Sequence, residues 1–227
     1  MQHFPDQETR LFIPGPAGQL QAIATPGRKS GDKPPKTAAN DAQQVAIVCH
    51  PHSLMGGTMN NKVVHTIART HRDQGHHVVR FNFRGVEQSE GEYAGGIGES
   101  DDLLAVMEWV KSCFPAAKIW LAGFSFGAFV AARTLSMALA KGYQVQHLLL
   151  VAPAVENYPF TDLTEFAVPM TVIYGDQDEV VDCSEIVAWF DSVATEKQVA
   201  CLAGAGHFFH GRLTELKSTV AAKCFAA

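Results

Sequence analysis

The chain has 227 residues, a formal net charge of −5, 47% hydrophobic residues and 18% charged residues. This length suits one sizeable hydrophobic core, so we expect a single domain over residues 1–227. The charge balance lacks the basic field typical of nucleic-acid-binding proteins, and no apolar run has the length of a membrane span. The first residues lack the basic and apolar segments of a secretory signal, which predicts a cytoplasmic protein.

The predicted elements begin with a hairpin at the amino terminus. Two short strand-like runs, 9–14 and 19–25, flank Gly15-Pro16-Ala17-Gly18, a pattern typical of an antiparallel edge hairpin. Residues 26–43 are polar and contain several prolines, glycines and lysines. This composition predicts a mobile loop in contact with solvent.

From residue 44 onward, apolar strands alternate with amphipathic helices. The continuous apolar run at 45–49 is typical of a strand that helices cover on both faces. Such alternation predicts an α/β fold with a mostly parallel, doubly wound sheet. The predicted strands span 45–49, 78–83, 119–122, 147–152, 170–174 and 198–202, and the predicted helices span 60–74, 99–113, a segment from Ala128, 183–193 and a closing segment around Leu216.

The strand at 119–122 leads into Gly123-Phe124-Ser125-Phe126-Gly127, which matches the G-x-S-x-G nucleophile elbow. The turn from strand to helix is so tight that the serine takes a strained backbone conformation. Side chains two residues before and after it would collide with neighbouring backbone, so glycine is required there. We therefore predict Ser125 as a nucleophile, with the backbone N–H of Phe126 as one donor to a developing oxyanion.

A serine hydroxyl needs a base, and the base needs a carboxylate that orients it. Four acids follow the predicted strand at 170–174: Asp176, Asp178, Glu179 and Asp182. We choose Asp178, because Asp176 lies in the turn itself, where an aspartate commonly bonds its own backbone. A turn and helix-capping cluster is the alternative interpretation, and it explains some of the four.

The predicted base is His207, which follows the last predicted strand in the segment 203–210. Glycines before it allow the loop to turn back over the sheet edge, and Phe208 and Phe209 can anchor that loop. His210 lies nearer the final helix and is the alternative base. The resulting chain order, Ser125 then Asp178 then His207, is the order of an α/β-hydrolase triad.

An oxyanion hole requires a second N–H, from the loop after the strand at 45–49. His50-Pro51-His52 occupies this place, and proline has no N–H to donate. The predicted donor is therefore the backbone N–H of His52, with Ser53 or Leu54 as alternatives.

Metal and disulfide chemistry find little support in the sequence. The cysteines at positions 49, 113, 183, 201 and 224 form no C-x-x-C pair, which predicts reduced thiols. The histidines at 50, 52, 207 and 210 could be taken for zinc ligands, but carboxylate and cysteine partners at zinc spacing are missing. We predict no metal and no cofactor.

These motifs together resemble the α/β-hydrolase superfamily, and more narrowly its small capless members with a His-Pro-His-x-x-x-Gly-Gly loop. The resemblance implies the α/β-hydrolase fold, with Ser125 as nucleophile, His207 as base and Asp178 as its partner. Relatives tend to have Arg-Gly-Val-Gly-x-Ser where this chain has 84–89, so Glu87 is a departure. The matching segments are 50–57, 60–64, 81–86, 123–127, 175–178 and 206–211, and they cover almost everything from residue 44 onward.

The resemblance also bears on the substrate. Cap domains in this superfamily usually follow the strand that here ends near Ala152, and the stretch up to Met170 leaves room only for a short crossover helix. A capless site predicts a serine hydrolase acting on short-chain acyl esters, with Met55, Phe124 and Phe126 as apolar contacts. The alternatives are an acyl thioesterase, a peptidase or a non-catalytic scaffold of the same fold. A homodimer is left open.

Overall fold

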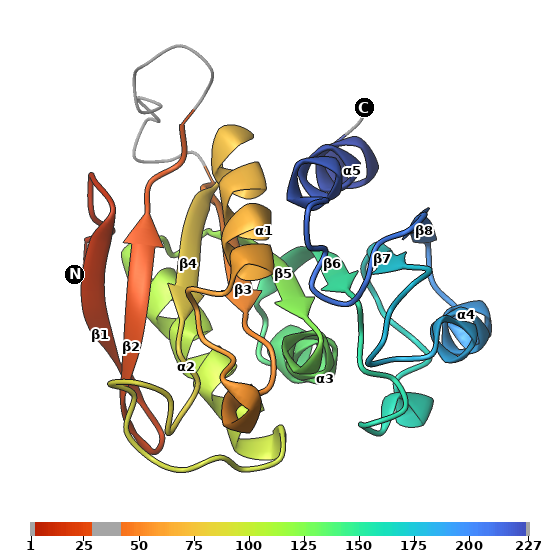
Figure 1. The fold of residues 1–227 in the computed structure, drawn as a ribbon. Helices are drawn as coiled ribbons and strands as arrows, with labels where there is room; N and C mark the ends of the chain where they lie inside the picture. Colours follow the sequence, from red (N-terminus) through yellow and green to blue (C-terminus); the bar gives the residue numbers. More distant parts are fainter. Residues whose placement is uncertain (1–2, 29–41, 226–227) are drawn as a thin grey trace.

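The computed structural model describes residues 3–28 and 42–225, and within them eight strands form one sheet in the order β1-β2-β4-β3-β5-β6-β7-β8 (Figure 1). β1 (Thr9–Gly15) and β2 (Gly18–Thr25) form the predicted antiparallel hairpin, and β2 pairs antiparallel with β4 (His77–Phe81). The predicted polar loop at 26–43 lies largely outside the described residues.

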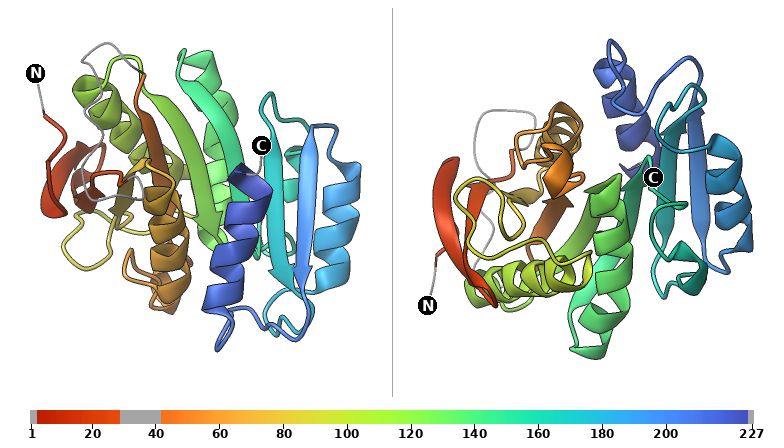
Figure 2. Two further views of the ribbon diagram at one scale, coloured as in Figure 1. Left: turned by 90° about the horizontal axis from the view of Figure 1, so that it is seen from above. Right: turned by 60° about the horizontal axis from the view of Figure 1, so that its bottom comes forward.

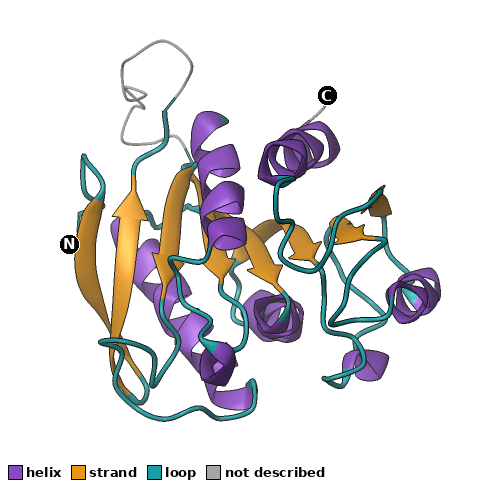
Figure 3. Cartoon of the chain, viewed as in Figure 1, coloured by secondary structure: helices purple, strands orange, loops and turns teal. Residues whose placement is uncertain are grey.

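The remaining strands run parallel to β4, as the alternating pattern predicted. Their carboxyl ends therefore meet at one edge of the sheet, and Figure 3 shows the arrowheads of β3, β4 and β5 directed to the same side. Loops that follow these strands converge there, which places the candidate residues near one another. The strands are β3 (Gln44–Cys49), β5 (Lys118–Phe124), β6 (Gln144–Val151), β7 (Met170–Gly175) and β8 (Lys197–Leu202).

Helices cover both faces of the sheet (Figures 1 and 2). α1 (Lys62–Asp73) and α5 (Leu213–Phe225) contribute to one apolar core, and α2 (Ile97–Cys113), α3 (Phe126–Ala140) and α4 (Cys183–Ser192) to the other. None of the described helices has both the length and the apolar character needed to cross a membrane.

Local sequence explains where the helices begin. The side chain of Asn61 accepts hydrogen bonds from the N–H groups of Val63 and Val64, which caps α1. In α2 the carboxylate of Glu99 accepts the N–H of Gly96, which lies just before the helix at φ +93°. Both caps start helices at the ends of loops that border the candidate site.

One sequence prediction of local structure is wrong. β4 ends at Phe81 and not at Phe83, because the N–H of Phe83 donates to the side chain of His50 instead of continuing the sheet. The crossover between β6 and β7 contains the 3-10 turn η2 (Phe160–Asp162), which fits within the room for a short helix that the sequence indicated. That crossover has no insertion of the size of a cap domain.

Candidate active site

Ser125 lies between β5 and α3 with φ +55° and ψ −117°, a conformation that costs a non-glycine residue about 1 to 3 kcal/mol. Its N–H donates to the carbonyl of Val151 on the neighbouring strand at 2.9 Å, which anchors the turn. A Cβ on Gly123 would lie 2.1 Å from the carbonyl oxygen of Gly127, and one on Gly127 would lie 2.5 Å from that of Cys49. The structure thus explains both glycines of the elbow.

Three polar side chains from different loops form a continuous chain of hydrogen bonds. Nε2 of His207 lies 3.0 Å from Oγ of Ser125, and its Nδ1 lies 2.8 Å from Oδ2 of Asp178. Ser125 is 7% exposed and His207 2% exposed, so the chain lies just below the surface. This arrangement can remove a proton from the serine hydroxyl and stabilise the imidazolium that results.

Asp178 is held as an ionised acceptor. Burial acts to raise the pKa of its carboxyl, but the hydrogen bond from His207 and those from two backbone N–H groups outweigh it, and the net pKa lies below the usual value. The two N–H groups, of Val180 and Val181, both donate to Oδ1 at 2.8 Å. Oδ2 is therefore left for the histidine.

The three neighbouring acids have structural partners. Oδ1 of Asp176 accepts the N–H of Gly204 at 2.5 Å, and Asp182 caps α4 through the N–H of Ser184. Glu179 accepts the backbone N–H of His207 at 3.0 Å. Sequence reasoning missed this contact, because nothing in the local pattern pairs a carboxylate with a backbone group on a distant loop.

Aromatic rings position the imidazole of His207. Phe124 packs beneath it with ring centroids 5.0 Å apart, and Phe208 meets its edge at 5.1 Å. Phe124 is completely buried, so its side chain supports the histidine and does not line the open surface. His210 is exposed, and its ring lies in a tilted arrangement 5.8 Å from that of Phe208, whereas the hydrogen bond to Ser125 comes from His207.

The loop after β3 forms the other side of the site. Phe126 is the first residue of α3, so its N–H has no acceptor within the helix. Its side chain is fully buried and packs against the ring of His52 at 5.4 Å. His52 precedes the 3-10 turn η1 (Ser53–Met55), and its carbonyl accepts the N–H groups of Met55 and Gly57. These contacts place the two predicted oxyanion donors on adjoining segments.

Two tyrosines that sequence reasoning missed complete an aromatic wall around His52. The ring of Tyr93 lies 4.9 Å and that of Tyr158 6.4 Å from the His52 ring, and both also contact Phe126. Burial and a hydrogen bond with Tyr93 raise the pKa of Tyr158. The tyrosines come from loops with no recognisable motif, so only the folded structure brings them together.

Several exposed apolar side chains lie on segments that adjoin the polar residues in the chain or at the start of α2. Met55 is 83% exposed, and the other members of this set lie on the loops that carry His52, Asp178 and His207 or at the start of α2. We call this set the apolar rim. It comprises Leu54, Met55, Ile97, Val180 and Phe208.

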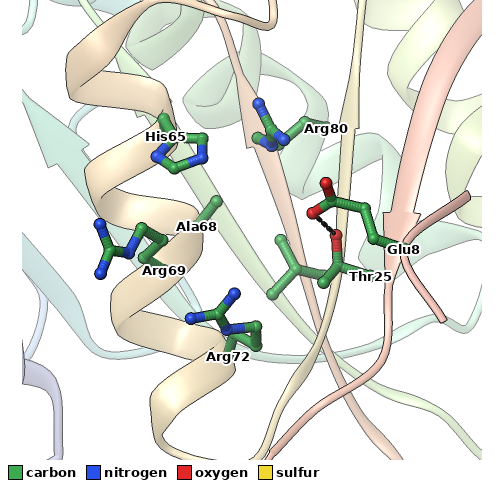
Figure 4. Close-up of a pocket in the computed structure, with 8 residues that line it drawn as sticks. Glu8, Thr25, His65, Ala68, Arg69, Arg72 and Arg80 are labelled. Carbon is green, nitrogen blue, oxygen red and sulfur yellow. Dashed lines mark hydrogen bonds between the residues drawn. The ribbon is translucent and has the colours of Figure 1, made fainter. Parts of the chain in front are cut away.

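A separate charged cleft lies between α1 and strands β2 and β4 (Figure 4). Its lining includes Arg69, Arg72 and Arg80 together with Glu8, whose carboxylate accepts the hydroxyl of Thr25 at 3.0 Å. The volume of the cleft is about 20 Å³, room for little more than one water molecule.

In residues 3–28 and 42–225, no group of three or more His, Cys, Asp or Glu side chains is arranged to bind a metal ion.

Comparisons with known proteins identify the family of this chain. The model of the family described as "Alpha/beta hydrolase domain" matches residues 44–223. The chain therefore belongs to the alpha/beta hydrolase domain family.

Solved structures and a sequence relative are similar over nearly the whole chain. XC6422 from Xanthomonas campestris, described as an a/b serine hydrolase without lid, is 37% identical with a TM-score of 0.85, over 99% of this chain and 98% of that chain. An alpha-beta serine hydrolase homologue from Coxiella burnetii is 39% identical with a TM-score of 0.84, over 98% and 100%. An uncharacterised protein of Rickettsia prowazekii is 29% identical over 220 residues, 93% of this chain and 86% of that protein.

Proposed function

We propose that the protein is a serine esterase that cleaves short-chain acyl esters through an acyl-enzyme. The observation that carries the proposal is the hydrogen-bond chain from Asp178 through His207 to Ser125, with the serine in the strained elbow. The similarity to proteins described as serine hydrolases, at 37% and 39% identity, adds support.

In the first half of the reaction, Oγ of Ser125 attacks the ester carbonyl carbon while Nε2 of His207 takes the hydroxyl proton. The new imidazolium is stabilised by the carboxylate of Asp178. The carbonyl oxygen becomes an oxyanion, and the N–H groups of Phe126 and His52 are the proposed donors to it. The tetrahedral intermediate collapses, and the alcohol leaves with the proton that His207 returns.

The second half repeats these steps with water as nucleophile. His207 takes a proton from the water as it attacks the acyl-enzyme, and returns it to Oγ of Ser125 when the acid leaves. Each of the two oxyanion donors is expected to lower the barrier by about 3 to 4 kcal/mol. The mechanism needs only groups that the chain supplies.

The apolar rim supports a substrate with an apolar acyl group. Met55 belongs to the loop that carries His52, and Phe208 adjoins His207, so exposed apolar side chains lie on two of the segments that carry proposed site residues. The short crossover between β6 and β7 has no segment that could cover the site, and an uncovered site favours short and varied acyl groups.

Acyl thioesters would react by the same steps. Arg84 is already bound to Asp102 through two guanidinium nitrogens, at 2.7 to 3.1 Å, so it is not free to bind phosphates of a thioester carrier.

Labelling with a fluorophosphonate probe tests this proposal. We expect stoichiometric labelling of the wild-type protein and none of the Ser125→Ala variant. Hydrolysis of p-nitrophenyl esters from acetate to decanoate, measured beside the matching thioesters, would then define the acyl range and the bond cleaved. Absence of labelling in the folded wild-type protein would refute the proposal and favour a non-catalytic scaffold.

A further inference from the structure

His50 is a completely buried histidine that the reaction scheme above does not use. It follows the carboxyl end of β3, and its ring packs against Phe83 with centroids 4.5 Å apart. Its Nε2 accepts the backbone N–H of Phe83 at 3.0 Å. A nitrogen that accepts a hydrogen bond carries no proton, so the neutral ring must carry its proton on Nδ1.

That proton has one acceptor close by. Nδ1 of His50 lies 2.6 Å from the carbonyl oxygen of Pro51, so it donates to this oxygen. The carbonyl belongs to the same peptide unit as the N–H of His52. This peptide bond is trans, so its C=O and its N–H point in opposite directions. Fixing the carbonyl on one side therefore fixes the N–H on the other.

We infer that His50 is a positioning residue, which holds the peptide between Pro51 and His52 so that the His52 N–H faces the reacting carbonyl oxygen. The inference rests on the proposed esterase function and assigns the oxyanion hole its means of preorganisation. A donor that is already oriented stabilises the transition state without reorganising during the reaction.

Other contacts hold the loop elsewhere. The N–H of Met59 donates to Oδ1 of Asn82 at 2.8 Å. The carbonyl of Met59 accepts Nη1 of Arg80 at 2.9 Å, and Arg80 is one of the residues that line the cleft in Figure 4. These bonds fix the end of the loop that leads to α1. Among the described residues, the Pro51 carbonyl accepts a hydrogen bond from His50 and from no other group.

Burial keeps the His50 ring in the required state. Desolvation lowers its pKa to about 4, although the bond to Pro51 acts in the opposite direction. The ring therefore stays neutral through the neutral pH range. An imidazolium would carry a proton on both nitrogens and could not accept the N–H of Phe83.

Two amide variants separate the two hydrogen bonds. In His50→Asn the side-chain amide takes the place of Nδ1, so it can still donate to the Pro51 carbonyl but cannot reach Phe83. In His50→Gln the terminal amide takes the place of Nε2, so its oxygen can still accept the Phe83 N–H but the donation to Pro51 is lost. Both variants remove one bond of a buried imidazole. His147→Asn, on β6 where the histidine bonds Thr171 at 2.9 Å, is the control for removing a buried histidine elsewhere.

We expect kcat to fall about 100-fold or more in His50→Gln, which is the size typical of losing one oxyanion donor. In His50→Asn we expect kcat to fall by less than about tenfold. KM should change little in either, because the affected bond forms only in the transition state. Inhibition by a trifluoromethyl ketone, whose adduct carries an oxyanion, should weaken in parallel with kcat. His147→Asn should lower the melting temperature and leave kcat unchanged. Equal losses in the two amide variants, or a larger loss in His50→Asn, would overturn the inference.

A measurement on the wild-type protein needs no variant to fold. Long-range ¹H–¹⁵N correlation spectra of histidine-labelled protein, with the His50 ring assigned by its absence in His50→Gln, should show that ring protonated on Nδ1 alone, unchanged between pH 8 and pH 5. Finding His50 protonated on Nε2 would refute the positioning role even if the enzyme is active. Absence of fluorophosphonate labelling in the wild type would instead refute the esterase, so the two failures are distinguishable.

Discussion

Nε2 of His207 lies 3.0 Å from Oγ of Ser125, although 82 residues separate them in the chain. In the sheet, β6 and β7 lie between the strand that precedes each residue. The loop after β8 must therefore turn back across two strands, and Gly204, at φ +73°, gives it a left-handed residue before His207. The carboxylate is on the loop that follows β7, one of these two intervening strands, because Asp178 comes three residues after its end.

The first prediction concerns Asp178→Asn. An amide cannot stabilise the imidazolium and can favour the wrong tautomer of His207, so we expect kcat to fall by about 10³- to 10⁴-fold. Fluorophosphonate labelling and p-nitrophenyl acetate hydrolysis measure the loss. Asp176→Asn is the matched control, because that carboxylate accepts the backbone N–H of Gly204 and has no hydrogen bond to His207 among the described residues. A comparable loss in the control would transfer the role to Asp176.

The second prediction concerns stability as a function of pH. Burial is the largest cause that lowers the pKa of four histidines to about 4, whereas the unfolded chain titrates near 6.5. The unfolded state thus binds more protons as pH falls through this window, so the free energy of unfolding should decrease steadily from about pH 6.5 to about pH 4. The four are His50, His76, His77 and His147.

Urea denaturation at half-unit pH intervals measures this slope. Protonation of Asp178 acts in the same direction, because its lowered pKa means that its contribution disappears only at the acidic end. In His147→Gln one of the titrating groups is missing, so the slope should be shallower by up to one proton. A free energy of unfolding that does not change between pH 6.5 and pH 4.5 would contradict the prediction.

The third prediction concerns the apolar rim. Met55→Ser should raise KM for longer acyl esters by about three- to tenfold and change acetate hydrolysis little, because each buried methylene contributes about 0.8 kcal/mol. Phe12→Ser is the matched control. Phe12 is 51% exposed but lies on β1, the edge strand that begins the sheet order. If both substitutions alter the chain-length profile equally, the rim does not contact the acyl group.

The fourth prediction concerns Glu87, which has a left-handed φ of +50°. Its Oε2 accepts Nδ2 of Asn82 at 2.8 Å, and this bond offsets part of the strain. Glu87→Ala removes the bond and keeps the strain, whereas Glu87→Gly removes both. We therefore expect the glycine variant to be more stable than the alanine variant by about 1 kcal/mol, as measured by thermal or urea unfolding. Equal stability of the two variants would show that the backbone here is not strained.

The sequence allowed much of the fold to be predicted, because the determining signals are local. The glycines at 123 and 127 surround a serine between an apolar strand and a small-residue helix, and this order has few structural solutions. The alternation of strands and helices fixes a parallel sheet, which places Ser125, Asp178 and His207 at one edge. The order of these residues along the chain then suffices to propose which atoms meet.

The parts that the sequence did not reveal depend on contacts between loops. The bond from Glu179 to the His207 N–H and the aromatic contacts of Tyr93 and Tyr158 join segments with no periodic pattern. Phe124 was expected to be one of the apolar contacts of the substrate. Alternation along β5 instead turns its side chain into the core beneath His207.

The brevity of the crossover between β6 and β7 affects the kinetics of the proposed esterase. A segment that holds only a single 3-10 turn cannot fold over the nucleophile and withdraw again. Substrate entry and alcohol departure would then occur by free diffusion, with no gating motion to wait for. Turnover would be set by formation and breakdown of the acyl-enzyme, and added viscogen would leave kcat unchanged.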